Sequence, residues 1–96
     1  MATHPEYRQW VREQLRGVDG VTDRPMMGEY LLYYRGRLVG GLYDDRLLIK
    51  PFPEAVACLP DAPRAVPYPG AKPMLVVEDV DDPTALMMLF QALARS

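Results

Sequence analysis

The side chains that could carry out nucleophilic chemistry are few and far apart in this sequence. Ser96 is the sole serine and His4 the sole histidine, and they stand near opposite ends of the chain. A serine nucleophile requires a neighbouring base, usually a histidine oriented by a carboxylate, so the parts of such a triad are missing. The sole cysteine, Cys58, lies in an apolar run (residues 55–59) where a small buried hydrophobic role is the common one, with a reactive thiol as the alternative. We therefore expect no enzymatic activity.

Acidic side chains occur in two groups, Asp44-Asp45 and the set Asp79, Asp81 and Asp82. General acid–base catalysis requires two carboxyl groups that converge across a cleft, whereas hairpin turns and helix starts favour aspartate for local hydrogen bonds. One cysteine and one histidine cannot build a structural zinc cluster, and neither acidic group has the spacing of a dedicated calcium loop. A weak Ca²⁺ or Mg²⁺ contact is the alternative, and we predict no metal and no cofactor.

Basic residues and glycines offer two further candidate sites. Arg8, Arg12 and Arg16 recur at four-residue spacing, which aligns them on the outer face of a helix. Such a row is usually solvated, and contact with an anion or nucleic acid is the alternative. Gly40-Gly41 indicates either close approach of a ligand to the backbone or, as we favour, a bulge or close packing of a helix or neighbouring chain. No phosphate-binding glycine pattern is present.

Bulk composition narrows the class of protein. The 96 residues are 49% hydrophobic, which suits one domain over residues 1–96 with a single core. The net charge of −2 argues against direct nucleic-acid binding, because nucleic-acid-binding domains usually carry a strong positive excess. A lone cysteine, no visible signal peptide and no apolar run of about 20 residues predict a cytoplasmic protein with no membrane anchor.

Hydrophobic periodicity predicts the element order α-β-β-β-α-β-α. The expected helices cover about residues 4–16, 54–59 and 83–95. The expected strands cover residues 29–34, 37–43, 46–50 and 74–78. This order lacks repeated strand–helix alternation, so it indicates an α+β domain with a single antiparallel sheet of about four strands and helices mainly on one face.

Particular residues refine this assignment. Thr3 and Glu6 have capping-box spacing at the start of the first helix. The apolar stripe of this helix is expected to consist of Tyr7, Trp10, Val11, Leu15 and Val18. Asp82, followed by proline, is expected to cap the last helix. Residues 19–25 are rich in turn formers and are expected to connect the first helix to the first strand without regular structure.

Both faces of the expected strands carry apolar side chains, yet the helices can cover only one face well. We call the other face the second face. We predict that the chain self-associates or docks a protein partner through this face and the sheet edge. The alternative is that the proline-rich segment, residues 60–73, folds over the second face and leaves a monomer. The candidate contact residues are Tyr30, Tyr33, Tyr34, Leu42, Tyr43 and Tyr68.

Four short motifs follow one another along the chain: residues 24–30 (RPMMGEY), 32–36 (LYYRG), 44–50 (DDRLLIK) and 68–72 (YPGAK). Together they resemble the N-terminal domain of the TfoX/Sxy family of competence regulators, over nearly the whole chain. The motif positions are Arg24, Met26, Gly28, Gly36, Asp45, Lys50, Pro69, Gly70 and Lys72. The resemblance implies an α+β domain with an antiparallel sheet flanked by helices, and a regulatory role in competence or transcription.

Two functional hypotheses follow from these observations. The first is a non-enzymatic regulatory or adaptor protein that acts through protein–protein contacts, as a partner's docking site or as a homodimer. The alternative is a small-ligand binding domain, in which the tyrosine-bearing sheet face and the proline-rich segment form a pocket.

Overall fold

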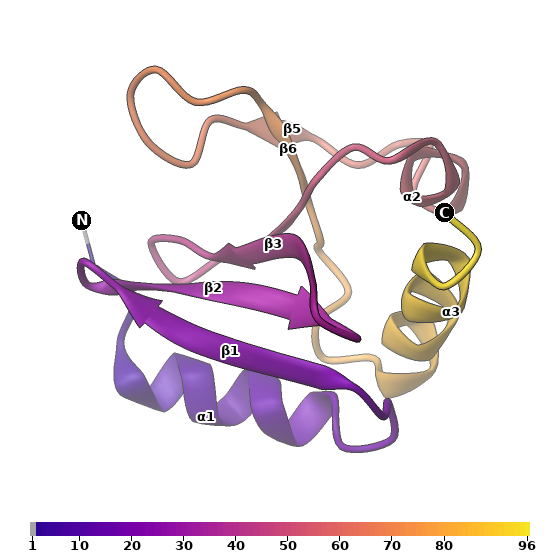
Figure 1. The fold of residues 1–96 in the computed structure, drawn as a ribbon, viewed down its shortest axis with the longest axis horizontal. Helices are drawn as coiled ribbons and strands as arrows, with labels where there is room; N and C mark the ends of the chain where they lie inside the picture. Colours follow the sequence, from indigo (N-terminus) through magenta and orange to yellow (C-terminus); the bar gives the residue numbers. More distant parts are fainter. Residues whose placement is uncertain (1) are drawn as a thin grey trace.

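A computed structural model of the protein describes residues 2–96 (Figure 1). The helices are α1 (Pro5–Gln14), α2 (Pro53–Cys58) and α3 (Pro83–Leu93). The strands are β1 (Val21–Met26), β2 (Glu29–Tyr34), β3 (Arg37–Leu42), β4 (Leu47–Ile49), β5 (Arg64–Ala65) and β6 (Met74–Val76). The strands form a single sheet in the order β1-β2-β3-β4-β6-β5, and every neighbouring pair is antiparallel. The α+β class and the single antiparallel sheet are thereby confirmed.

The sheet contains six strands, so the expectation of about four strands is wrong. β1 occupies the stretch predicted to be turn-rich. Asp23 and Pro25 are disfavoured in strands, and Pro25 is tolerated because β1 is an edge strand that pairs on one side only. β5 lies inside the proline-rich segment and is two residues long, too short to give a periodic pattern. Both missed strands lie at the edges of the sheet, where pairing on one side suffices.

Two-residue turns connect the first four strands. Their central residues, with φ angles, are Met27 (52°) and Gly28 (87°), Arg35 (52°) and Gly36 (81°), and Asp44 (54°) and Asp45 (56°). Positive φ at both central positions defines the type I′ turn, whose twist matches that of antiparallel strands. The expected strand bounds leave residues 35–36 and 44–45 as two-residue connections, and the turns at Arg35-Gly36 and Asp44-Asp45 confirm them. Glycine is therefore favoured at the motif positions 28 and 36 for a structural reason, because a residue with a side chain is strained at those φ values.

The hydrophobic core lies between the sheet and the three helices. The sheet contributes Leu32, Val39, Leu42, Leu47, Ile49 and Leu75 to it, and α3 contributes Leu86, Leu89, Phe90 and Leu93. The α3 residues recur at three- and four-residue spacing, as an amphipathic helix over the expected residues 83–95 requires. Each fully buried side chain of this size stabilises the fold by about 1.5–3 kcal/mol. No helix within residues 2–96 is both long and apolar enough to span a membrane.

The two predicted helix caps have different outcomes. Asp82 accepts hydrogen bonds from the backbone N–H groups of Thr84 (3.0 Å) and Ala85 (3.2 Å), so the cap of α3 is confirmed. The Thr3–Glu6 capping box does not form, because the Thr3 hydroxyl donates to Oε1 of Glu29 at 2.8 Å. Thr3 therefore ties the N-terminal segment to β2 and makes no bond to its own helix.

The expected apolar stripe of α1 is confirmed at Tyr7, Val11, Leu15 and Val18 and is wrong at Trp10. The helix packs on the sheet through Val11 and Leu15, which are buried and four residues apart. Trp10 lies one residue off this line and is 38% exposed, with its ring against Tyr7. The tryptophan belongs to the margin of the interface between helix and sheet.

Candidate functional site

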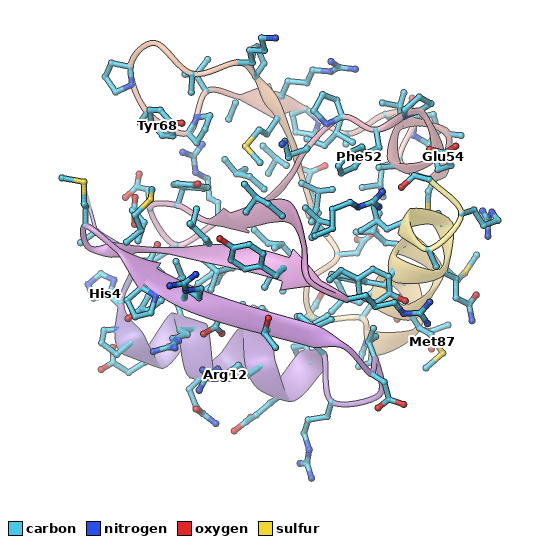
Figure 2. All side chains as sticks on the ribbon, viewed as in Figure 1. His4, Arg12, Phe52, Glu54, Tyr68 and Met87 are labelled. Carbon is cyan, nitrogen blue, oxygen red and sulfur yellow. The ribbon has the colours of Figure 1, made fainter. Side chains whose placement is uncertain are left out.

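The β5–β6 loop, residues 66–73, stands over the second face of the sheet, while α1 lies under the opposite face (Figure 1). Tyr68 on this loop and Arg12 on α1 mark the two sides of the sheet (Figure 2). Beneath the loop, the second face carries its own apolar cluster. The cluster consists of Leu31, Tyr43, Leu48, Ala65, Met74 and Val76. The loop covers this cluster only in part, and the space between them is a cleft.

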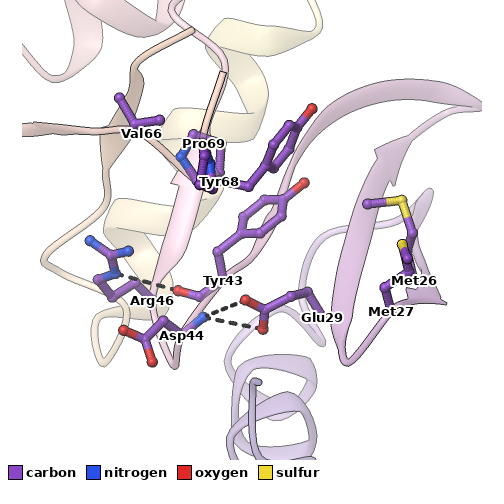
Figure 3. Close-up of a pocket in the computed structure, with 10 residues that line it drawn as sticks. Met26, Met27, Glu29, Tyr43, Asp44, Arg46, Val66, Tyr68 and Pro69 are labelled. Carbon is purple, nitrogen blue, oxygen red and sulfur yellow. Dashed lines mark hydrogen bonds between the residues drawn. The ribbon is translucent and has the colours of Figure 1, made fainter. Parts of the chain in front are cut away.

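The cleft has two compartments that share Met26, Tyr43, Pro67 and Tyr68. The turn compartment, about 850 Å³, is also lined by Met27, Glu29, Asp44, Arg46 and Val66 (Figure 3). The lysine compartment, about 380 Å³, is also lined by Leu31, Leu38, Lys50, Lys72 and Met74. Both volumes lie in the range of small-molecule sites, which are concave, mainly apolar and equipped with a few polar groups.

Two tyrosines stand between the compartments. The Tyr43 and Tyr68 ring centroids are 6.3 Å apart, and Figure 3 shows both hydroxyls pointing the same way, on the side of Met26. Tyr43 is 5% exposed and Tyr68 53% exposed, so one ring is fixed in the sheet and the other is carried by the loop. Burial, with added repulsion from Tyr68, raises the pKa of Tyr43 above its ordinary value. The Tyr43 phenol therefore stays protonated near neutral pH and can donate a hydrogen bond.

The two central glycines of β3 shape the sheet beside the cleft. The β2–β3 register shifts between Leu32 and Tyr33, which is a bulge. A Cβ atom on Gly40 would lie 2.0 Å from the Leu48 carbonyl oxygen, and one on Gly41 would lie 2.5 Å from the Tyr43 ring. The expected bulge is confirmed, whereas the close neighbours of the two glycines are adjacent strands and a tyrosine ring rather than a helix. The missing side chain of Gly41 leaves the space that the Tyr43 ring occupies.

A polar network fixes the floor of the turn compartment. Glu29 accepts from the Thr3 hydroxyl (2.8 Å) and from the Asp44 N–H (3.2 and 3.3 Å). The Asp45 N–H donates to the Thr3 hydroxyl oxygen at 3.2 Å. The His4 N–H donates to Asp45 at 2.8 Å. These bonds hold the β3–β4 turn to the start of α1, so Glu29 and Asp45 have structural roles beside the cleft.

The structure divides the predicted contact residues between the two faces. Tyr43 and Tyr68 line the cleft, and Tyr33 lies further along the same face, opposite Leu38. Tyr30, Tyr34 and Leu42 lie on the opposite face, which the helices cover. Tyr34 meets Phe90 edge-on at 5.2 Å and Leu42 is 1% exposed. The six residues therefore form no common surface.

The family-like motifs converge better than the tyrosines do. Met26, Lys50, Pro69 and Lys72 all line the cleft, although they come from three different motifs. Arg24 pairs with Leu31 and so lies on the second face as well. The remaining motif residues, Gly28, Gly36, Asp45 and Gly70, form turns or the loop.

Sequence reasoning missed Leu31, Leu38, Met27 and Arg46 as lining residues. It also assigned no binding role to Lys50 and Lys72, which it treated only as motif positions. A signal was present, because these are the two lysines of the chain and each precedes a proline.

The arginine row of α1 is partly paired, which corrects the expectation of a solvated face. Arg8 Nε donates to Asp23 at 3.0 Å, and Arg12 donates twice to the same carboxylate at 2.9 Å. The Asp23 side chain is 5% exposed. Burial raises the pKa of Asp23, but the hydrogen bonds from Arg12 and Arg8 outweigh burial and leave that pKa below its ordinary value. The ion pairs fasten α1 to β1, and the Arg8 guanidinium is paired with Asp23.

The remaining candidates lie away from the cleft. Cys58 is half-buried against the hydrophobic core, and Asp82 is occupied by capping α3. Among residues 2–96, no three His, Cys, Asp or Glu side chains gather as a metal site would require.

The fold and the cleft define a small α+β protein with helices on one face of a six-stranded antiparallel sheet and a loop-roofed cleft on the other. The chain is 38% identical over 80 residues to an uncharacterised 12.7 kDa protein from the trpE 5′ region of Spirochaeta aurantia. The match covers 83% of this chain and 70% of that protein, and the chain belongs to the same family. No family model matches the chain, and no solved structure matches it.

Proposed function

We propose that the protein is a non-enzymatic regulatory domain of the TfoX/Sxy type that acts by binding a small ligand in the cleft. The observation that carries this proposal is the β5–β6 loop, which roofs the second face and leaves two compartments of about 850 and 380 Å³. A loop that completed the core would close this space. This one holds a half-exposed tyrosine above a buried tyrosine and leaves a cavity between sheet and roof.

The composition of the cleft supports binding and gives no support to catalysis. Its walls are mainly aromatic, methionine, leucine and proline side chains, with a few charged groups at defined places. His4 and Cys58, the residues best suited to proton transfer or nucleophilic attack, do not line it. The proposal includes no direct contact with nucleic acid, given the net charge of −2.

A fragment screen by ¹⁵N–¹H NMR tests the proposal. Small aromatic and aliphatic compounds that bind should shift the amide signals of Gly41, Tyr43 and Tyr68, and no other cluster of residues. Tyr68→Ala should weaken every such compound, because the exposed ring can be removed without loss of core packing. Met88→Ala, an equally exposed apolar truncation on α3, should leave binding unchanged. A library that shifts no cleft amide, or binding that Tyr68→Ala leaves intact, counts against the site.

A second candidate function, contact with a protein partner or a second copy, is favoured by one observation. Met27 is 95% exposed at the tip of the β1–β2 turn, and Val66 (49%) and Tyr68 (53%) stand near it around the mouth of the turn compartment. Exposed apolar groups gathered at one place are typical of contact surfaces. Sedimentation velocity at micromolar concentration tests self-association, which Met27→Asn should weaken if this rim forms the interface.

A further inference from the structure

Lysine is used sparingly in this chain. Two of the eleven basic residues are lysines, Lys50 and Lys72, and the other nine are arginines. Both lysines line the lysine compartment, and no arginine does. The general surface charge of the protein is therefore carried by arginine, while the two flexible ammonium groups are placed at one cavity.

The fold brings the two lysines together through the pairing of β4 with β6. Ile49 pairs with Leu75 in an antiparallel register, so the residue that follows β4 and the residues that precede β6 lie at the same end of the two strands. Lys50 directly follows β4, and its N–H donates to the Val39 carbonyl at 2.8 Å. Each lysine precedes a proline, which restricts its backbone to extended conformations. Both lysine residues are exposed, so their ammonium groups are accessible to a ligand.

The charges of the cleft are segregated between its compartments. Glu29 and Asp44 line the turn compartment with Arg46, whereas no acidic residue lines the lysine compartment. Among the described residues, the ion pairs involve His4, Arg8 and Arg12 and neither lysine. Two like charges beside an apolar surface repel each other, and a bound anion relieves that repulsion. A lysine ammonium, with three rotatable donors, donates hydrogen bonds to carboxylate or phosphate oxygens in many geometries.

The rest of the lysine compartment is apolar. Leu31, Leu38 and Met74 line it together with Tyr43 and Tyr68. A volume of about 380 Å³ is suited to a molecule of roughly one or two rings or an equivalent chain. Both tyrosine rings offer a face against which a flat group can stack.

From this arrangement we propose that the lysine compartment binds a small organic anion with an apolar ring or chain, its acidic group held by Lys50 and Lys72 and its body against Tyr43 and Tyr68. This inference rests on the proposed ligand-binding function of the cleft. It adds the chemical class of the ligand and the residues that select the charge.

Three probes of one shape and different charge test the selection: 2-naphthoate, naphthalen-2-ylmethanol and naphthalen-2-ylmethylammonium. Because the chain has two lysines, reductive ¹³C-methylation, which keeps their charge, gives two lysine signals that single Lys→Gln variants assign. 2-Naphthoate should shift both signals and bind roughly tenfold more tightly than the alcohol. The ammonium compound should bind more weakly still. 2-Naphthyl phosphate, compared with the carboxylate, shows which acidic group the lysines prefer.

Matched variants separate a local effect from the effect of net charge. Lys50→Gln/Lys72→Gln should abolish the preference for the acid over the alcohol. Arg16→Gln/Arg95→Gln removes the same charge from exposed residues outside the cleft and should leave the preference intact. Equal binding of acid and alcohol at the cleft overturns the anion inference and leaves the ligand-binding function standing. No binding by any probe also overturns the inference, and the function itself falls only if the broader fragment screen fails too.

Discussion

The Nδ1 atom of His4 lies 2.6 Å from Oδ2 of Asp45, although 41 positions of sequence separate the two residues. The His4 backbone N–H donates to the other oxygen of the same carboxylate at 2.8 Å. Asp45 thus joins the first residues of the chain to the β3–β4 turn beneath the cleft. Hydrogen bonding to Asp45 raises the pKa of His4, and the backbone and ring of His4 lower the pKa of Asp45.

The first prediction concerns the protonation of this pair. Because the pKa of His4 is raised above 6.5, its contribution to stability is complete below that value and is lost as pH rises through the higher one. Because the pKa of Asp45 is lowered below 3.8, its contribution is present above that value and is lost as pH falls through the lower one. A ¹H NMR titration of the single imidazole should give a pKa above 6.5 that Asp45→Asn brings back toward it. Asp81→Asn should leave the titration unchanged, and an unshifted imidazole in the native protein would contradict the contact.

The second prediction concerns Asp23 and its two arginines. Asp23→Ala removes a nearly buried acceptor and leaves Arg8 without its partner, so the free energy of unfolding should fall by about 2 kcal/mol in a urea titration. Arg12→Ala should cost less, because the Arg12 side chain is 50% exposed and water screens its charge. Asp19→Ala, an exposed aspartate before β1, serves as the control. An equal loss in Asp19→Ala would show that the effect is not due to the ion pair.

The third prediction concerns the glycines of β3. Gly40→Ala places a methyl group 2.0 Å from a backbone oxygen that cannot move alone, so the free energy of unfolding should fall by more than about 2 kcal/mol. Gly41→Ala should destabilise and also tilt the Tyr43 ring, which should weaken binding in the cleft. Gly17→Ala, where the nearest atom is a flexible methionine methyl at 3.4 Å, should change stability by less than about 0.5 kcal/mol. Equal urea midpoints for Gly40→Ala and Gly17→Ala would refute the packing argument.

The fourth prediction separates stability from contact at Met27. Asparagine is preferred over methionine at the first central position of a type I′ turn. Met27→Asn should therefore increase the free energy of unfolding by about 0.5–1 kcal/mol, which is measured as a higher thermal midpoint. The same change removes the most exposed apolar side chain at the rim of the cleft. We therefore expect a more stable protein with weaker self-association. A more stable protein that associates as before would place the interface elsewhere.

Local chemistry was sufficient to predict some elements of the fold. Asp82 with its following proline defines the start of α3, and the buried stripe through Leu86 and Phe90 defines the face it presents. The turns at Arg35-Gly36 and Asp44-Asp45 are likewise set by two residues each.

The features that were missed depend on contacts with other elements of the fold. β1 exists because β2 supplies its ladder and because Arg8 and Arg12 bind Asp23, and neither relation is visible in the residues of β1. The lysine compartment depends on the pairing of β4 with β6, across α2 and β5. Sequence periodicity reports which face of an element is apolar, and it does not report which strands become neighbours.

The roof of the cleft is attached through β5, an edge strand of two residues that pairs with β6 at two positions and with no other strand. Detaching it breaks few hydrogen bonds and one tyrosine–tyrosine contact, while the core under the helices stays intact. The dissociation rate of a compound bound beneath the loop would then be set by the rate at which β5 detaches from β6. Its residence time would change with substitutions at Arg64 or Ala65 that never touch it.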